Sequence, residues 1–228
     1  MNRQSSEQAQ KATTSPEAHN LSSRTDDPGR LQAFSDGVFG VAITLLVLNI
    51  QVPHLKDYQG ISTLAAELLK QWPVYLSYII SFFTVGIVWA NHHNTFMVIV
   101  KADHTLRMFN LLLLMSVTLI PFTTALLSEY IQQPAEQQTA AFVYGLGWVF
   151  LSTAYNLLWR YAVRRNYVDP QLSAALVKKL TWRVFTGFIL YIVAVASALA
   201  SAAISILICL ALVVFYLIPV ESLPDFMQ

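Results

Sequence analysis

Residues 34–50 read FSDGVFGVAITLLVLNI, an apolar run that carries a single charged side chain, Asp36, near its start. The run belongs to a segment over residues 31–52, which has the length of about 20 residues that a membrane-spanning helix requires. Pro53 ends the segment. The sequence therefore predicts a first spanning helix here, and the aspartate within it needs an explanation.

The composition of the whole chain is typical of an integral membrane protein. Of its 228 residues, 55% are hydrophobic and only 12% are charged, whereas soluble domains carry about 25% charged residues. The mean hydropathy of +0.51 agrees. Cys209 is the only cysteine, so neither an intramolecular disulfide nor a cysteine-based metal site is expected. No basic face with interleaved aromatic residues indicates a nucleic-acid partner. We expect an all-α protein that lies in a lipid bilayer and needs no cofactor.

Six apolar segments are predicted to cross the membrane. They cover residues 31–52, 73–91, 106–127, 139–159 and two parts of 184–220, a stretch too long for one span that we divide near Ala200 and Ser201. Short linker helices are expected over residues 61–70 and 170–179. Pro121, inside the third segment, predicts a kink.

The six segments are expected to form one domain, residues 30–220, between two tails. Residues 1–29 are rich in Ser, Gln, Thr, Asp and Glu and lack the apolar core of a signal peptide, so we expect a disordered cytoplasmic tail. Residues 221–228 are expected to form a short cytoplasmic tail.

Positive charges are distributed unequally between the two sides of this six-helix arrangement. Of the 14 Lys and Arg residues, all but Lys56 and Lys70 lie in the N-terminal tail or in the regions after the second and fourth segments. Loops rich in Lys and Arg stay in the cytoplasm. The charge distribution therefore predicts that both termini are cytoplasmic.

An apolar stripe runs along the predicted first helix. At about 100° per residue, Val41, Thr44, Leu45 and Leu48 lie at i, i+3, i+4 and i+7 and share one face. Asp36 points about 80–180° away from all four of them on the same helical projection. The stripe and the aspartate are therefore predicted to point in different directions.

An ionisable side chain inside a span normally contacts a partner or water. The sequence NHHNTF, with two histidines, ends the second segment on the membrane side where the first segment begins. We predict a cluster at one depth that combines Ser35, Asp36, Trp89, His92 and His93, with Arg30 joining it from a neighbouring helix or subunit.

Two roles stay open for Asp36: a packing network that fixes the first helix, or an ion or proton site. Adjacent histidines point about 100° apart on a helix, which is poor geometry for a chelated metal. The polar residues form no acid–base pair, nucleophile elbow or phosphate loop, so an enzyme is not expected. A proton-coupled secondary transporter that uses Asp36 with His92 or His93 is the alternative to a channel.

The first segment resembles a known signature. RLQAFSDGVFGVAITLLVLNI is similar to the RxxxFSD pattern of the transmembrane protein 175 family, the lysosomal potassium channels and their bacterial relatives. Arg30, Phe34, Ser35 and Asp36 match the signature, and WANHHNTF resembles the Trp–His motif further along the chain. Animal members carry two such repeats, whereas this chain has one, as bacterial members do.

The resemblance implies a potassium-permeable leak channel in the bacterial inner membrane, built as a homotetramer with four first helices around one pore. The TVGYG carbonyl filter of other potassium channels is absent from the sequence. The resemblance instead places an apolar constriction on Val41, Leu45 and Leu48, with Thr44 as a polar ring. Val41 stands where the family more usually has Ile or Leu. Stacked apolar rings of this kind gate by dewetting.

Overall fold

The computed structural model describes residues 28–53 and 63–217 of the chain. Within these ranges the elements are α3 (Pro28–Leu45), the 3-10 turn η1 (Leu46–Asn49), α4 (Leu64–Lys70), α5 (Trp72–Val98), α6 (His104–Tyr130), α7 (Gln137–Arg164), α8 (Ala174–Ala198) and α9 (Ala202–Leu217). The prediction of an all-α fold is confirmed for this part of the chain. The tails expected over residues 1–29 and 221–228 lie outside it, except that α3 begins at Pro28.

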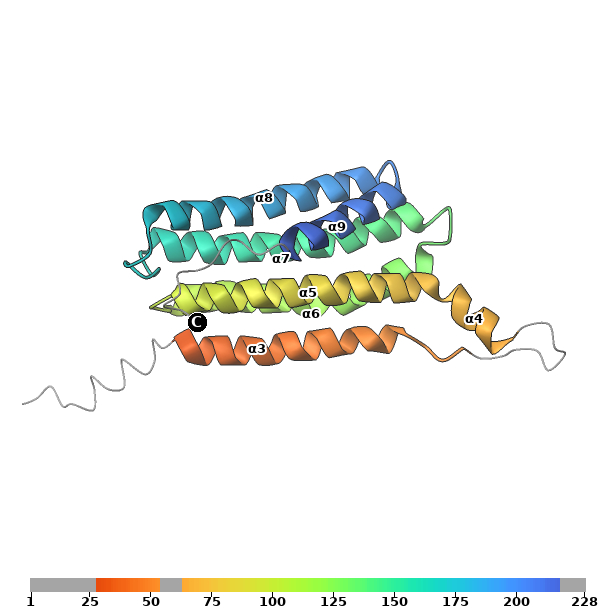
Figure 1. Cartoon of the computed structure of the whole chain (residues 1–228), viewed down its shortest axis with the longest axis horizontal. Helices are drawn as coiled ribbons and strands as arrows, with labels where there is room; N and C mark the ends of the chain where they lie inside the picture. Colours follow the sequence, from red (N-terminus) through yellow and green to blue (C-terminus); the bar gives the residue numbers. More distant parts are fainter. Residues whose placement is uncertain (1–27, 54–62, 218–228) are drawn as a thin grey trace, which may run out of the picture.

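The long helices run side by side and reverse direction from one to the next (Figure 1). α3 lies at one edge of the bundle and packs on α5 and α6. α8 and α9 lie at the other edge, where both pack on α7. Within the described part of the chain, the first helix is thus held by two long helices, α5 and α6, on one of its sides.

Within residues 28–53 and 63–217, five helices are long and apolar enough to cross a bilayer: α3 together with η1, α5, α6, α7 and α8. The sixth apolar helix, α9, has 16 described residues. At 1.5 Å per residue it spans about 24 Å, less than the hydrocarbon thickness of about 30 Å. The chain is therefore a multi-pass membrane protein, and its sixth span stays a prediction.

The helix boundaries follow local chemical signals. Asp103 caps α6, because its carboxylate accepts a hydrogen bond from the Leu106 N–H at 2.8 Å. α7 ends shortly before Asn166, whose φ of 56° is the left-handed conformation in which many helices stop. The chain is therefore directed sharply from α7 into the connection to α8.

Two linker predictions had different outcomes. The helix expected over residues 61–70 is seen as α4 over Leu64–Lys70. The prediction of a separate helix over residues 170–179 is wrong. Ser173 caps α8, and α8 runs unbroken from Ala174 to Ala198. The break predicted near Ala200 and Ser201 lies where the structure has the turn between α8 and α9.

Basic side chains gather in one half of the bundle. The start of α3, the α5–α6 connection and the α7–α8 connection lie at the same end (Figure 1). Two backbone hydrogen bonds join these connections, from the Val100 N–H to the Tyr167 carbonyl at 2.8 Å and from the Asp169 N–H to the Val98 carbonyl at 2.9 Å. Within the described ranges, Lys70 alone among the Lys and Arg residues lies at the opposite end. We call the end with the other basic residues the basic end.

Candidate functional site

The apolar stripe of the first helix faces away from the rest of the chain. Val41, Leu45 and Leu48 are 58%, 40% and 69% exposed. Thr44 is also exposed, and its hydroxyl donates a hydrogen bond to the Val41 carbonyl at 2.8 Å. Although the helix tightens into η1 after Leu45, Leu48 keeps the exposure of the stripe. The four side chains therefore form an open apolar face that contains one hydroxyl.

The opposite face of the same helix is closed. Ser35, Phe39, Ala42 and Leu46 recur at helical spacing and are all fully or almost fully buried. The Phe39 ring lies against the His92 ring of α5, with 5.3 Å between the ring centroids. Since α3 packs on α5 and α6 through this face, the closed face sets the direction in which the open face points.

A buried set of hydrogen bonds joins α3, α5 and α6. The Asn110 amide of α6 donates to the Ser35 hydroxyl at 2.9 Å, and this hydroxyl donates to the Leu31 carbonyl at 2.8 Å. The Asn110 carbonyl oxygen lies 2.8 Å from His92 Nε2 of α5. Ser35, His92 and Asn110 are all 0% exposed. We call these three residues the buried polar set.

A second set lies beside it and is half-exposed. The Trp89 indole N–H of α5 donates to Asp36 Oδ1 at 2.8 Å. His93 Nδ1 lies 3.6 Å from Asp36 Oδ2, a contact that becomes an ion pair when the imidazole is protonated. The Gln32 amide nitrogen lies 2.9 Å from the same His93 nitrogen. Gln32, Asp36, Trp89 and His93 form what we call the rim polar set.

The structure thus distributes the predicted cluster over two sets. Asp36 contacts Trp89 and His93, while Ser35 and His92 are bridged by Asn110. Neither Asn110 nor Gln32 was predicted. Asn110 has a readable signal in the sequence, since it is an amide inside the apolar run LRMFNLLLLM, where a polar side chain needs a partner. Gln32 precedes Asp36 by four positions and therefore lies on the same side of α3.

Arg30 and Phe34, the other two signature residues, lie apart from both sets. Arg30 is exposed at the start of α3, and no hydrogen bond or ion pair of its side chain is formed within the described part of the chain. Phe34 is 56% exposed. Both side chains are therefore available to a neighbouring molecule.

The adjacent histidines serve different neighbours. His92 points into the core, where its ring also stacks on Phe96 at a centroid distance of 4.5 Å. His93 points to the rim polar set. No group of three or more His, Cys, Asp or Glu side chains that could hold a metal occurs among residues 28–53 and 63–217.

These features define a multi-pass helical membrane protein whose first helix is anchored on one face and open on the other. The family model described as "Endosomal/lysosomal potassium channel TMEM175" matches residues 30–121, the part that contains both polar sets. A Streptomyces collinus potassium channel is 39% identical over 178 residues, which cover 78% of this chain and 85% of that protein. The chain therefore belongs to the TMEM175 family.

Further relatives agree. A potassium channel from Chamaesiphon minutus is 38% identical, with 83% of this chain and 93% of that protein covered. The crystal structure of a lysosomal potassium-selective channel TMEM175 homolog from the same species matches with a TM-score of 0.76 at 38% identity, covering 84% of this chain and 96% of the other. The rat endosomal/lysosomal proton channel TMEM175 is 39% identical over 113 residues, only 23% of its length. The family and these relatives are channels, not enzymes.

Proposed function

We propose that this chain forms a potassium-permeable, leak-type cation channel in which the open face of α3 lines the pore. The observation that carries the proposal is the contrast within α3, where Val41, Leu45 and Leu48 are exposed while the other face is anchored. Potassium is favoured as the ion because the relatives from S. collinus and C. minutus are potassium channels.

One copy of α3 cannot enclose a pore, so the proposal includes a homotetramer with four first helices around a shared axis. Val41, Leu45 and Leu48 of four copies then form stacked apolar rings, which conduct when wetted and close when dewetted. Gly37 and Gly40 support close packing between copies. A Cβ built at either position would meet open space in the single chain, so both glycines lie where a neighbouring subunit could approach. Small residues of this kind let neighbouring helices approach each other.

Thr44 gives the proposed pore its polar ring. Its hydrogen is used in the bond to the Val41 carbonyl, so the hydroxyl oxygen keeps acceptor lone pairs for another partner. Four such oxygens between apolar rings would contact a partly dehydrated cation. We propose that Thr44 favours cations, while the neighbouring leucines set the diameter.

The two polar sets are proposed to act as anchors of the pore helix. The buried polar set fixes α3 against α5 and α6, and the rim polar set holds Asp36 away from the open face. Arg30 and Phe34 complete the anchor through a neighbouring subunit. A structural role for Asp36 is favoured by its short bond to the Trp89 indole.

A proton-coupled transporter that uses Asp36 with a histidine is the second candidate. Two observations favour proton movement at the rim polar set. The rat relative is named a proton channel, and Asp36 lies 3.6 Å from His93. His92 does not extend this path, because it is bonded to Asn110 in the buried polar set. A transporter predicts saturable uptake that is lost in Asp36→Asn, whereas the channel predicts non-saturating flux.

The proposed location is the bacterial inner membrane, with both termini in the cytoplasm. The distribution of basic residues supports this orientation, because all described Lys and Arg residues except Lys70 lie toward the basic end. Protease accessibility of tags at the two termini, in intact and in opened spheroplasts, tests it.

Potassium flux into liposomes tests the function. Wild-type protein reconstituted with a potassium gradient should conduct. Leu48→Ala should increase the flux and lower potassium-over-sodium selectivity, because it removes the most exposed apolar side chain of the stripe. A dewetting barrier lowered by about 1.4 kcal/mol corresponds to about tenfold faster permeation.

Ile189→Ala is the matched control, since Ile189 is an exposed aliphatic residue on α8, at the other edge of the bundle. Its flux should equal that of the wild type. Equal flux in Leu48→Ala, Leu45→Ala and Ile189→Ala would show that the stripe faces lipid or protein and not the pore. Folded wild-type protein that carries no potassium would refute the channel itself.

A further inference from the structure

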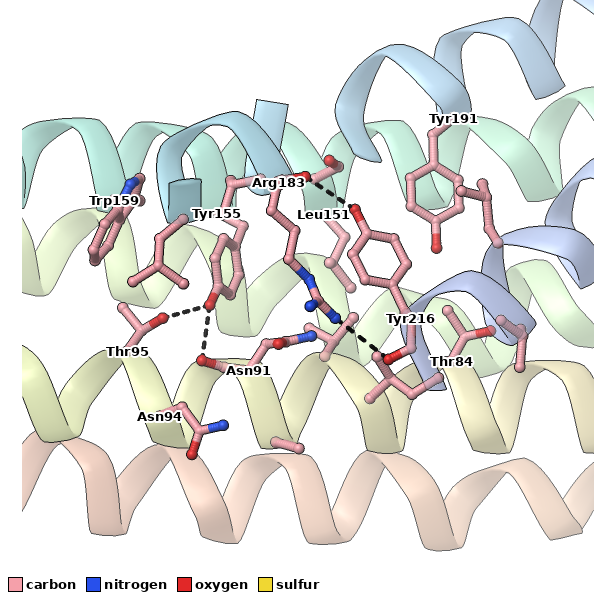
Figure 2. A pocket seen from close by; sticks show the side chains of 18 of the residues that line it. Thr84, Asn91, Asn94, Thr95, Leu151, Tyr155, Trp159, Arg183, Tyr191 and Tyr216 are labelled. Atoms are coloured by element: carbon pink, nitrogen blue, oxygen red, sulfur yellow. Dashed lines mark hydrogen bonds between the residues drawn. The ribbon is translucent and has the colours of Figure 1, made fainter. Parts of the chain in front are cut away.

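A cavity of about 460 Å³ lies among α5, α7, α8 and α9, away from the open face of α3. Figure 2 shows Asn91, Asn94 and Thr95 of α5 below it and Arg183 of α8 reaching into it. The cavity lies toward the basic end, because α5 ends at Val98, only a few residues beyond these side chains. None of the residues proposed to line the pore or to anchor α3 lines this cavity.

Arg183 gives the cavity a positive charge. Among the described residues that line the cavity there is no Asp or Glu, and Arg183 is the only Lys or Arg. An arginine stays protonated in proteins. Its Nε is buried and has no hydrogen-bond partner within the described part of the chain. The cavity therefore holds a cation that no described lining residue neutralises.

The position of the guanidinium is fixed by Tyr216 of α9. Arg183 Nη2 donates to the Tyr216 carbonyl at 3.4 Å, and the guanidinium carbon lies 5.3 Å from the centre of the tyrosine ring. The Tyr216 hydroxyl donates to the Arg183 carbonyl at 3.3 Å (Figure 2). Gly187 leaves room for this arrangement, because the hydroxyl occupies the space that a Cβ there would need. The arginine is thus held in place before any ligand arrives.

The other walls combine few polar groups with a larger apolar surface. The Tyr155 hydroxyl donates to the Asn91 carbonyl at 2.9 Å and lies 2.6 Å from the Thr95 hydroxyl. Apolar and aromatic walls are supplied by Leu151, Tyr191, Leu212 and Val213. A ligand that fits both parts has an anionic head and a hydrocarbon body.

The depth of Arg183 matches that of a lipid headgroup. Arg183 lies nine positions after the start of α8, about 14 Å along the helix axis. It follows directly on Trp182, which is 59% exposed, as tryptophans at a membrane–water interface are. Lys178 and Lys179 lie one turn closer to the basic end, and anionic lipids concentrate in the cytoplasmic leaflet.

We propose that this cavity binds an anionic phospholipid of the leaflet at the basic end, with its phosphate on Arg183 and its acyl chains along the apolar walls. Arginine binds phosphate through charge-assisted hydrogen bonds, and Nε with one Nη would supply two parallel donors. The lipid joins α8 and α9 to α5, which packs directly on the pore helix.

Native mass spectrometry of the full-length protein with added phosphatidylglycerol tests the site. The wild type should retain phosphatidylglycerol in preference to phosphatidylcholine. Arg183→Gln should lower its affinity by at least about tenfold, because the variant loses the charge-assisted hydrogen bonds to the phosphate. Arg160→Gln is the matched control, since Arg160 is exposed in the same half of the bundle and lies over the Phe185 ring.

A second variant separates the cavity from the charge. Ala90→Phe keeps Arg183 but places a ring in the cavity, which Ala90 lines from an exposed position on α5. This variant should also lose phosphatidylglycerol, and it remains informative if Arg183→Gln does not fold. Retention equal to the wild type in either folded variant would overturn the proposal. Equal retention of phosphatidylcholine, or displacement of the lipid by millimolar inorganic phosphate, would overturn it as well.

Discussion

The two faces of α3 differ sharply in exposure. Phe39 and Ala42 are buried against α5 and α6, whereas Val41 and Leu48, a few residues away, are more than half exposed. Every polar anchor of the helix belongs to its closed side or to the rim beside it. The open face offers one hydroxyl, that of Thr44.

The contrast shows how the rotation of a membrane helix about its own axis is fixed. Apolar side chains alone fix the rotation of a helix poorly in a bilayer, because lipid tails solvate any apolar face about equally well. Hydrogen bonds between buried polar groups are directional, and their loss leaves an unsatisfied group in the hydrocarbon region. We therefore propose that Asn110, which is bonded to both Ser35 and His92, fixes the rotation of α3 and thereby the direction of the stripe.

The largest effect is expected when the closed face loses its main side chain. Phe39→Ala removes a fully buried ring that packs on His92 and should lower the free energy of unfolding by about 3–5 kcal/mol. Phe34→Ala is the matched control on the exposed part of the same helix and should change it by no more than about 0.5 kcal/mol.

Thermal unfolding of both variants in detergent measures this difference. If Phe34→Ala lowers the transition temperature as much as Phe39→Ala, the buried face of α3 contributes no more to stability than its exposed part. A loss of oligomer without a loss of fold in Phe34→Ala would instead identify a contact with a neighbouring subunit.

The next effect concerns the buried polar set. Asn110→Leu removes the acceptor of His92 and the donor to Ser35 at once and should destabilise the fold by about 1–3 kcal/mol. Asn94→Leu, at an exposed position of α5, is the control and should have little effect. Equal transition temperatures for wild type and Asn110→Leu would show that apolar packing alone sets the rotation of α3.

The shared face of the stripe was predictable from the sequence, because a period of 3.6 residues places Val41 and Leu48 on one side of the helix whatever the helix packs against. A cluster that contains Asp36 and Trp89 was predicted from depth alone, since both residues lie toward the same end of antiparallel helices; which of its members contacts Asp36 was not predicted. The sequence predicts a linker helix over residues 170–179 and a span from residue 184, because the basic residues between and near them interrupt the apolar run, whereas α8 is continuous. In a long helix such residues extend beyond the apolar region without breaking it.

The sequence marks Asn110 as an amide in an apolar run, but it could not predict that Asn110 pairs with Ser35. Asn110 is 75 positions away in the sequence. Its amide reaches the Ser35 hydroxyl only because the packing of α6 on α3 places the two residues at the same height along the bundle. The Arg183 cavity was missed for the same reason, since Tyr216 reaches the arginine through the packing of α9 on α8. Periodicity predicts which residues share a face of one helix. Predicting contacts between two helices also requires their relative positions along the bundle axis and their rotations about their own axes.

A smaller effect is expected at the rim polar set. Asp36→Asn keeps an oxygen that accepts from the Trp89 indole and loses only the charge opposite His93. Partly exposed ion pairs contribute about 0–1 kcal/mol, so the change in stability should stay within that range. Trp89→Phe, which removes the donor itself, should cost more. Thermal unfolding of the two variants checks this order, and a larger loss in Asp36→Asn would assign the charge itself a structural role.

The smallest change in stability at neutral pH is expected for substitution of Asp103. This residue caps α6 and so helps to hold Asn110 of the same helix at the height of Ser35 and His92. Partial burial raises the pKa of the Asp103 carboxyl, but hydrogen bonds from Tyr161, the Leu106 N–H and Tyr167, together with the charge of Arg165, outweigh it and leave this pKa below its usual value. A lowered folded-state pKa stabilises the fold above the unfolded-state pKa of about 3.9.

This contribution is lost as the pH falls through the lowered folded-state pKa. Asp103→Asn retains a side chain that caps helices well, so its stability near pH 7 should fall only slightly. Its transition temperature should depend less on pH than that of the wild type below about pH 4, the range in which an unperturbed aspartate titrates. Unfolding curves between neutral and acidic pH measure the difference. Parallel curves for the two proteins would show that Asp103 does not hold α6, and that the closed face of α3 keeps its register through the contacts of Asn110 and Phe39.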